Sequence, residues 1–173
     1  MKLIKLLTAT MIAVVTAFSV YAGEAKDKVK VGFVYVGPTG DHGWTYRHDI
    51  GRKQVEEAYG DRVETMFVES VGYGPDAYRV MKQMALQGVD IVFGTSFGYM
   101  DSMRKLAEEY PNTKFEHATG YKSNETNFAN YGLRLYQARH VQGVIAGMMT
   151  KTNKICYVAA YPIPEVIREI NTC

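Results

Sequence analysis

Short apolar runs alternate with amphipathic stretches along this chain of 173 residues, and that alternation constrains the fold more than any other feature. The apolar runs have the length of buried strands, whereas the stretches between them repeat their apolar residues with the period of a helix. We expect strands at 29–36, 63–69, 89–94, 113–117, 127–135 and 154–160, and helices at 44–59, 75–87, 99–110 and 137–149. This order predicts an α/β fold with a mostly parallel sheet and helices on both faces.

Glycine and proline mark the expected helix boundaries. Pro75 takes the favoured first position of the second helix and Gly88 stops it. Pro111 ends the third helix, because its ring prevents a further helical hydrogen bond. The small residues at 143, 146 and 147 predict that the last helix packs closely against a sheet.

The loops that follow the strands are where we expect a ligand, because the carboxyl ends of parallel strands meet at one edge of the sheet. These loops span 37–43, 70–74, 94–98 and 118–124. The candidate ligand-binding residues lie in them or directly beside them: Asp41, His42, Trp44, Tyr73, Ser96, Phe97 and Thr119.

Aromatic side chains dominate this set. Trp44, the single tryptophan, lies where a strand passes into a helix, and a flat heteroaromatic ligand stacked on it would gain roughly 1–3 kcal/mol. The alternative is a helix anchor buried against the sheet. Phe97 either packs under its loop or forms a second wall, and Tyr73, between two glycines, is either placed over the cleft or exposed on a turn.

The polar candidates carry similar alternatives. Asp41 precedes a helix by three residues, so it either caps the first turn or accepts a hydrogen bond from a ligand, and both roles are compatible. Thr95 or Ser96 is expected to cap the next helix in preference to touching a ligand. His42 is a polar contact or a solvated loop side chain.

Enzyme and metal signatures are missing from the sequence. The four histidines do not have zinc-ligand spacing, so no metal is expected. Phosphate-binding glycine loops, a nucleophile elbow and a zinc-protease motif are also missing, and we expect no cofactor. This lowers the expectation of an enzyme.

Residues 1–22 have the organisation of an export signal. Two lysines precede an uncharged apolar run that is short for a membrane span, and small residues precede the expected cleavage point. Removing this segment lowers the 20 basic residues to 18, which equals the 18 acidic residues. A neutral mature chain has no electrostatic footprint for nucleic acid.

The two cysteines allow a disulfide in an oxidising compartment. Cys156, however, lies inside an apolar run and is typical of a small buried strand residue, and Cys173 is the last residue. We therefore favour a buried thiol at Cys156 over a disulfide.

Five runs taken together resemble the basic membrane protein (BMP) family of substrate-binding proteins for ABC importers, which is similar to purine nucleoside receptors. They are VGFVYVG at 31–37, DHGW at 41–44, GTSFG at 94–98, YPNTKF at 110–115 and QGVIAGM at 142–148. The resemblance implies a type I periplasmic-binding-protein lobe, one of two lobes that close on a ligand. It places the first lobe at 23–150, and the hinge crossing with the start of a truncated second lobe at 151–173.

The resemblance also implies roles for individual residues. Trp44 takes the place of the family's base-stacking aromatic, Asp41 that of its loop acid and Phe97 that of a cleft-lining residue. Thr45 stands where the nucleoside binders usually have asparagine, and the fourth strand does not end in their aspartate. Because that carboxylate could hold a ribose diol, its loss favours a free purine base over a nucleoside.

The sequence therefore predicts an exported, non-catalytic binding protein that captures a nucleobase or nucleoside and delivers it to an ABC permease. A truncated cleft predicts weak binding. One alternative is a periplasmic nucleoside hydrolase with Asp41 and His42 as acid and base. Another is a sensory ectodomain that binds the same ligand.

Overall fold

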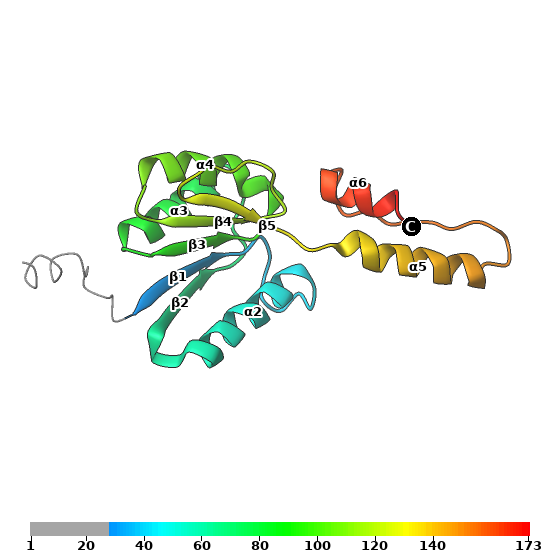
Figure 1. Cartoon of the computed structure of the whole chain (residues 1–173), viewed down its shortest axis with the longest axis horizontal. Helices are drawn as coiled ribbons and strands as arrows, with labels where there is room; N and C mark the ends of the chain where they lie inside the picture. Colours follow the sequence, from blue (N-terminus) through cyan, green and yellow to red (C-terminus); the bar gives the residue numbers. More distant parts are fainter. Residues whose placement is uncertain (1–27) are drawn as a thin grey trace, which may run out of the picture.

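The computed structural model describes residues 28–173, so the expected export signal lies outside the described residues. Five strands form one parallel sheet in the order β2-β1-β3-β4-β5 (Figure 1). The strands are β1 (Val29–Val34), β2 (Val63–Val68), β3 (Ile91–Gly94), β4 (Lys114–Ala118) and β5 (Phe128–Tyr131). All four strand pairs are parallel, as the alternation of strands and helices predicts.

Helices cover the sheet unequally. Among the described residues, one face carries α3 (Pro75–Leu86) and α4 (Met100–Glu109), and the opposite face carries only α2 (Trp44–Tyr59) (Figure 1). A short 3-10 turn, η1 (Gly60–Arg62), follows α2, and a second one, η2 (Phe97–Tyr99), precedes α4. The predicted α/β fold with helices on both faces is confirmed, and one face is less covered than the other.

The main hydrophobic core lies between the sheet and the α3–α4 pair. Met81, Met103, Leu106 and Phe115 have no exposed surface there, so they exclude water from that whole face. A smaller cluster of Val31, Phe33 and Tyr35 lies on the α2 face, and its side chains follow the two-residue alternation of β1.

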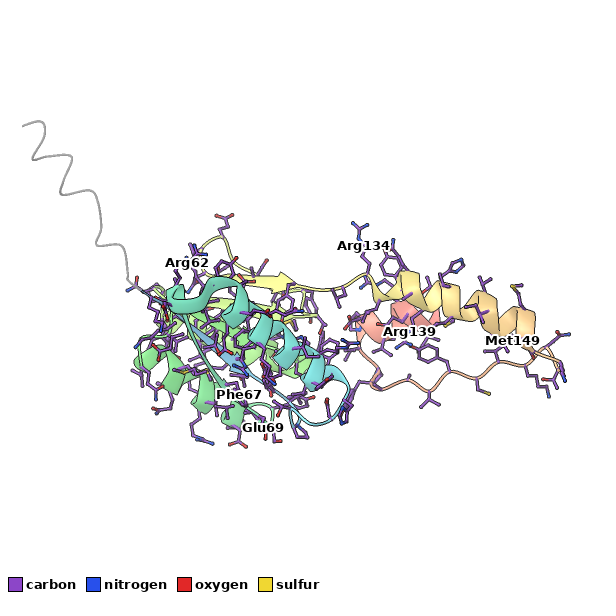
Figure 2. All side chains as sticks on the ribbon, turned by 90° about the horizontal axis from the view of Figure 1, so that it is seen from below. Arg62, Phe67, Glu69, Arg134, Arg139 and Met149 are labelled. Atoms are coloured by element: carbon purple, nitrogen blue, oxygen red, sulfur yellow. The ribbon has the colours of Figure 1, made fainter. Side chains whose placement is uncertain are left out.

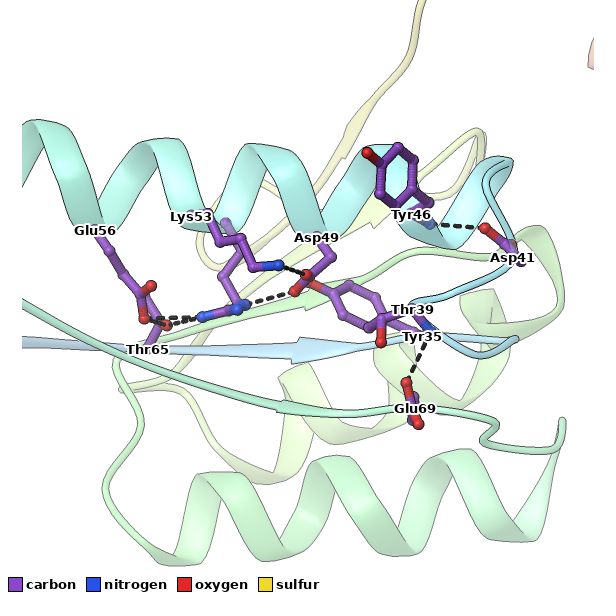
Figure 3. Close-up of polar contacts among 10 residues, drawn as sticks. Tyr35, Thr39, Asp41, Tyr46, Asp49, Lys53, Glu56, Thr65 and Glu69 are labelled. Atoms are coloured by element: carbon purple, nitrogen blue, oxygen red, sulfur yellow. Dashed lines mark hydrogen bonds and ion pairs between the residues drawn. The ribbon is translucent and has the colours of Figure 1, made fainter.

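A polar network fixes α2 against β1 and β2 (Figure 3). The Tyr35 hydroxyl and the Arg52 guanidinium both donate to the Asp49 carboxylate, over 3.4 and 2.8 Å. Arg52 also donates to Glu56 and to Thr65 on β2. Burial, and secondarily the Asp49 charge, raise the pKa of Tyr35, so the phenol stays protonated and keeps its donor.

The last two helices leave the sheet. The helices α5 (Leu135–Met149) and α6 (Pro164–Ile170) pack on each other beyond the end of β5 (Figure 1). A Cβ on Gly143 would collide with the backbone of Cys173, and Arg139 Nε donates to Glu169 over 3.0 Å. The small residues of α5 therefore allow close approach of the α6 end, whereas the sequence predicts approach to a sheet.

The expected strand at 154–160 is wrong. This segment forms no ladder with any described strand, and Val158 is 96% exposed. A strand needs a neighbour for its main-chain donors and acceptors, and the five-stranded sheet ends before this segment. Cys156 is accordingly exposed and not buried, and both cysteines are free thiols.

Candidate ligand-binding cleft

A cavity of about 380 Å³ lies at the carboxyl edge of the sheet, between the strand-end loops and the α5–α6 pair. Five of the seven candidate residues line it: Trp44, Tyr73, Ser96, Phe97 and Thr119. The loops after β1, β2, β3 and β4 therefore converge as the parallel topology predicts. Residues from beyond the sheet, including Arg139, Tyr161 and Glu165, close the other side.

Trp44 begins α2 and presents its indole at the cavity. The indole Nε1 donates to the carbonyl of Thr95 over 2.6 Å, and the Thr95 hydroxyl donates to the Val34 carbonyl over 3.0 Å. The side chain of Trp44 remains 38% exposed, so it is not the fully buried anchor of the alternative interpretation. The indole is held in one orientation and has accessible ring surface.

Asp41 caps α2. Its carboxylate accepts hydrogen bonds from the amides of Gly43, Thr45 and Tyr46, at 2.7, 3.1 and 3.0 Å. Desolvation raises the pKa of Asp41, but the three hydrogen bonds together outweigh it and hold the pKa below its usual value. The capping role is confirmed. Asp41 does not line the cavity, and a carboxylate so engaged is poorly suited to act as a general acid.

His42 also lies outside the cavity. Its backbone has a φ of 52°, its side chain is exposed and its ring lies 5.3 Å from that of Tyr46. A left-handed backbone is uncommon for a residue other than glycine. Ser70 and Thr119 share this conformation, so three strand-end loops contain a strained residue, a pattern found near binding sites.

Tyr73 folds against the loop after β3. The Ser96 hydroxyl donates to the Tyr73 hydroxyl over 3.3 Å, and the Tyr73 and Tyr99 rings meet edge to face at 5.7 Å. A Cβ on Gly98 would lie 2.6 Å from the Tyr73 ring, so glycine is required for this approach. The expected capping by Thr95 or Ser96 is wrong, because their hydroxyls bond to Val34 and Tyr73.

The sequence pattern does not distinguish His117 from the other three histidines, yet its ring contacts the backbone of the cavity residue Ser96. The ring is fully buried, with Nε2 2.8 Å from the Ser96 carbonyl and Nδ1 3.2 Å from Asn130 Oδ1. Burial lowers the pKa of His117, and a neutral ring donates a single hydrogen bond, to either the Ser96 carbonyl or Asn130 Oδ1. The sequence feature that could have identified His117 is a histidine at an inward-facing position of a buried strand.

The far side of the cavity contains residues that sequence reasoning missed. Glu169 is buried and accepts hydrogen bonds from Arg139 and from the Tyr157 hydroxyl, at 3.0 and 3.2 Å. Glu165 is partly buried and has no hydrogen-bond or ion-pair partner within residues 28–173, and burial followed by the Glu169 charge raises its pKa. The sequence feature that could have identified these two residues is the concentration of charged residues in 165–169. This segment lies outside the strand-end loops.

Residues 28–173 contain no cluster of three or more histidine, cysteine, aspartate or glutamate side chains placed to hold a metal ion. No helix in the same part of the chain is long and apolar enough to cross a membrane.

A family described as ABC transporter substrate-binding protein, PnrA-like, matches residues 28–172. The chain belongs to this Bmp family. That assignment confirms the resemblance drawn from the sequence motifs, and members of the family are substrate-binding proteins.

Two curated relatives of this Bmp-family chain differ in the ligand that their names give. A purine-binding protein of Brucella abortus is 51% identical over 151 residues, which cover 87% of this chain and 43% of the relative. An ABC transporter protein of Haloferax volcanii, named for glucose binding, is 48% identical over 84% of this chain and 36% of its own length. The chain spans less than half the length of either relative.

Solved structures share the fold. A solute-binding protein of an ABC transporter system from Aeropyrum pernix superposes with a TM-score of 0.68 at 20% identity, covering 82% of this chain and 40% of the other. A transcriptional activator of the comK gene from Bacillus halodurans gives 0.64 at 24% identity, covering 83% and 48%. These likenesses support the periplasmic-binding-type α/β fold.

Proposed function

We propose that this Bmp-family chain forms one wall of the ligand cleft of an exported substrate-binding protein, and that its ligand is a purine base or nucleoside. In the complete protein, an ABC permease in the membrane would receive that ligand. The relative named a purine-binding protein, 51% identical to this chain, supports the ligand class.

The observation that carries the proposal is the orientation of Trp44. Its hydrogen bond to Thr95 fixes the indole where accessible ring surface borders the cavity, and Tyr73 and Phe97 line the same space. Aromatic faces bind flat heterocycles by stacking, which gives roughly 1–3 kcal/mol per base. A sugar without a base would use less of this surface.

Polar groups around the cavity would fix the orientation of the base. Ser96 and Thr119 offer hydroxyl groups, and Glu165 offers a carboxyl group that has no partner within the described range. The strand β4 ends at Ala118, without the carboxylate expected to hold a ribose diol. We therefore rank a free base above a nucleoside.

Ligand-observed NMR tests the proposal with adenine, guanine, hypoxanthine, inosine and glucose. We expect purine bases to bind weakly, with dissociation constants of roughly millimolar order, because this chain spans less than half the length of its purine-binding relative and supplies only part of such a cleft. Glucose should show no saturation transfer. Glucose binding without purine binding, or submicromolar binding of any of these compounds, would refute the proposal.

Trp44→Ala and Trp44→Phe test the stacking wall. Loss of the indole should weaken purine binding about tenfold or more, and a phenyl ring should restore part of it. Tyr59→Ala, at the other end of α2, is the matched control and should bind as the parent chain does. Equal binding by Trp44→Ala and the parent would show that the ligand does not bind against the Trp44 indole.

A further inference from the structure

A large groove lies on the less covered face of the sheet. This groove has a volume of about 940 Å³, with α2 as one wall and apolar side chains of β1, β3 and β5 as its floor. Phe33 and Phe93 stack there with ring centroids 5.0 Å apart, and Phe93 meets Tyr131 edge to face at 5.8 Å.

The width of the sheet explains why the groove is open. Five strands spaced about 4.8 Å apart span roughly 19 Å, which is room for two packed helices about 10 Å across. The opposite face has two helices, whereas the groove face has only α2, which contacts β2. Within residues 28–173, one helix position over β3, β4 and β5 is therefore vacant.

The vacant position contains an unpaired carboxylate. Glu116 on β4 is in register with Phe93 on β3 and Ala129 on β5, so its side chain points to the groove side of the sheet. It has no hydrogen-bond or ion-pair partner in residues 28–173. Burial, and secondarily the Glu116 charge, raise the pKa of the groove residue Tyr131. A helix with an apolar stripe and a nearby cation would complement this surface.

The helix α5 has these properties. Its side facing α6 uses Tyr136, Arg139, His140 and Gly143, whereas Val141, Val144, Ile145 and Met148 form a stripe on another side. These four side chains are 50–83% exposed. Figure 2 shows α5 projecting beyond the sheet, with Arg134 at its beginning and Met149 at its far end.

The charge of α5 complements the groove, and its length is sufficient to cover the strands. Residues 127–163 contain no aspartate or glutamate, and Arg134 at the beginning of α5 has no ion-pair partner in the described chain. A helix of 15 residues is about 22 Å long, whereas β3, β4 and β5 have four, five and four residues and span roughly 13–17 Å, so the helix covers them and extends past their ends. Arg47 and Arg62 on the α2 rim oppose a cation, but the stripe itself is uncharged.

We propose that the groove binds α5 of a second copy of this chain, so that two copies exchange helices around a two-fold axis. Gly132 and Leu133 precede α5 and line the mouth of the groove. The two exchanged α5 segments therefore pass beside each other at this mouth, on the two-fold axis. The partner's Arg134 then enters at the end of the groove where β4 finishes, two residues after Glu116.

The area required is modest. A specific interface buries at least about 1,000 Å² of accessible surface in total. Reciprocal docking buries four apolar surfaces, namely two α5 stripes and two grooves, so each supplies only roughly 250 Å². Four aliphatic side chains that are at least half exposed can provide that area on the helix.

Sedimentation velocity and light scattering of the purified chain, from low to several hundred micromolar, test the proposal. We expect a reversible dimer. Ile145→Asp places a charge in the stripe and should weaken the dimer about 100-fold or more. Gln142→Asp, on α5 but off the stripe, retains an acceptor for Arg139 and should leave the dimer unchanged.

A charge reversal tests the register. Glu116→Arg and Arg134→Glu should each weaken the dimer about tenfold, and the double variant should restore it. Failure of restoration overturns the proposed register, and a dimer insensitive to Ile145→Asp overturns the use of α5. A chain that stays monomeric overturns the proposal. If such a monomer binds the unmatched portion of the Brucella relative, the groove belongs to a segment of a longer protein.

Discussion

The indole Nε1 of Trp44 lies 2.6 Å from the carbonyl oxygen of Thr95 and donates a hydrogen bond to it. This contact joins the first turn of α2 to the end of β3, which are 51 positions apart in the sequence. The residue proposed to stack on a ligand is thus fixed by the strand whose loop supplies Ser96 and Phe97.

Asp41→Ala should destabilise the fold. The variant removes the acceptor for three amides at the beginning of α2, and the loss of a helix cap costs about 1–2 kcal/mol. The free energy of unfolding in urea measures this. Asp61→Ala, an exposed aspartate in η1, is the control and should change the free energy little. Equal stability of Asp41→Ala and the parent would exclude a capping contribution.

The Asp41 cap should also depend on pH. The pKa of its carboxylate is lower in the folded than in the unfolded chain, so its contribution is complete above the unfolded pKa of about 4. The contribution is lost as the pH falls through the folded pKa. Asp41→Asn should therefore flatten the loss of stability below about pH 4. An unchanged acid slope would show that other carboxylates cause it.

His117→Gln should reduce stability and remove a pH dependence near neutrality. Burial lowers the pKa of His117, so the unfolded chain binds more protons as the pH falls below about 6.5. The parent should lose stability over that range, whereas the variant should lose less, apart from the share of His48, whose pKa burial also lowers. Chemical unfolding at several pH values measures both slopes. Identical slopes would contradict this role.

Gly98→Ala should displace the Tyr73 ring, because the new Cβ would lie 2.6 Å from it. Overpacking of this kind costs about 1–3 kcal/mol. Gly40→Ala is the control in a loop at the same edge, where no atom lies within 4 Å of the added Cβ. Chemical shifts of the Tyr73 ring and urea unfolding give the two readouts, and an unmoved ring would contradict the contact.

Arg139→Ala should loosen the α5–α6 pair and leave the sheet intact. The variant leaves the buried Glu169 carboxylate with the Tyr157 hydroxyl as its remaining side-chain partner, at a cost of about 1–3 kcal/mol. Amide exchange should accelerate in α5 and α6 but not in β1 or β3. Lys151→Ala, which removes an exposed lysine beyond the end of α5, provides the comparison. Uniform exchange changes would show that the two parts unfold together.

Local sequence patterns predicted most of the sheet because buried strands and amphipathic helices have distinct periods. The five strands and the helices α2 to α5 were located within a few residues, and the strand-end loops converged as parallel topology requires. The run at 154–160 has the same apolar pattern but forms no strand, because a ladder depends on a neighbour that local sequence does not specify.

The cleft was only partly predictable for a related reason. Residue type and loop position identified Trp44, Tyr73 and Phe97, which line the cavity. Asp41 and His42 lie in the loop that precedes Trp44, but neither lines the cavity. The Asp41 carboxylate is engaged in capping hydrogen bonds, and the positive φ of His42 directs its side chain away. Glu165 reaches the cavity from α6, and such a contact depends on how α5 and α6 fold back.

Trp44 borders both the cleft and the groove on the α2 face. A molecule in either space therefore meets the same indole, and any influence of one occupant on the affinity for the other must be mutual by thermodynamic linkage. Because this is the sole tryptophan, its emission reports on both spaces at once. Quenching by an occupant of the cleft is distinguished from quenching by an occupant of the groove with a variant that alters only one of the two spaces. Ile145→Asp is such a variant, because it affects only occupation of the groove.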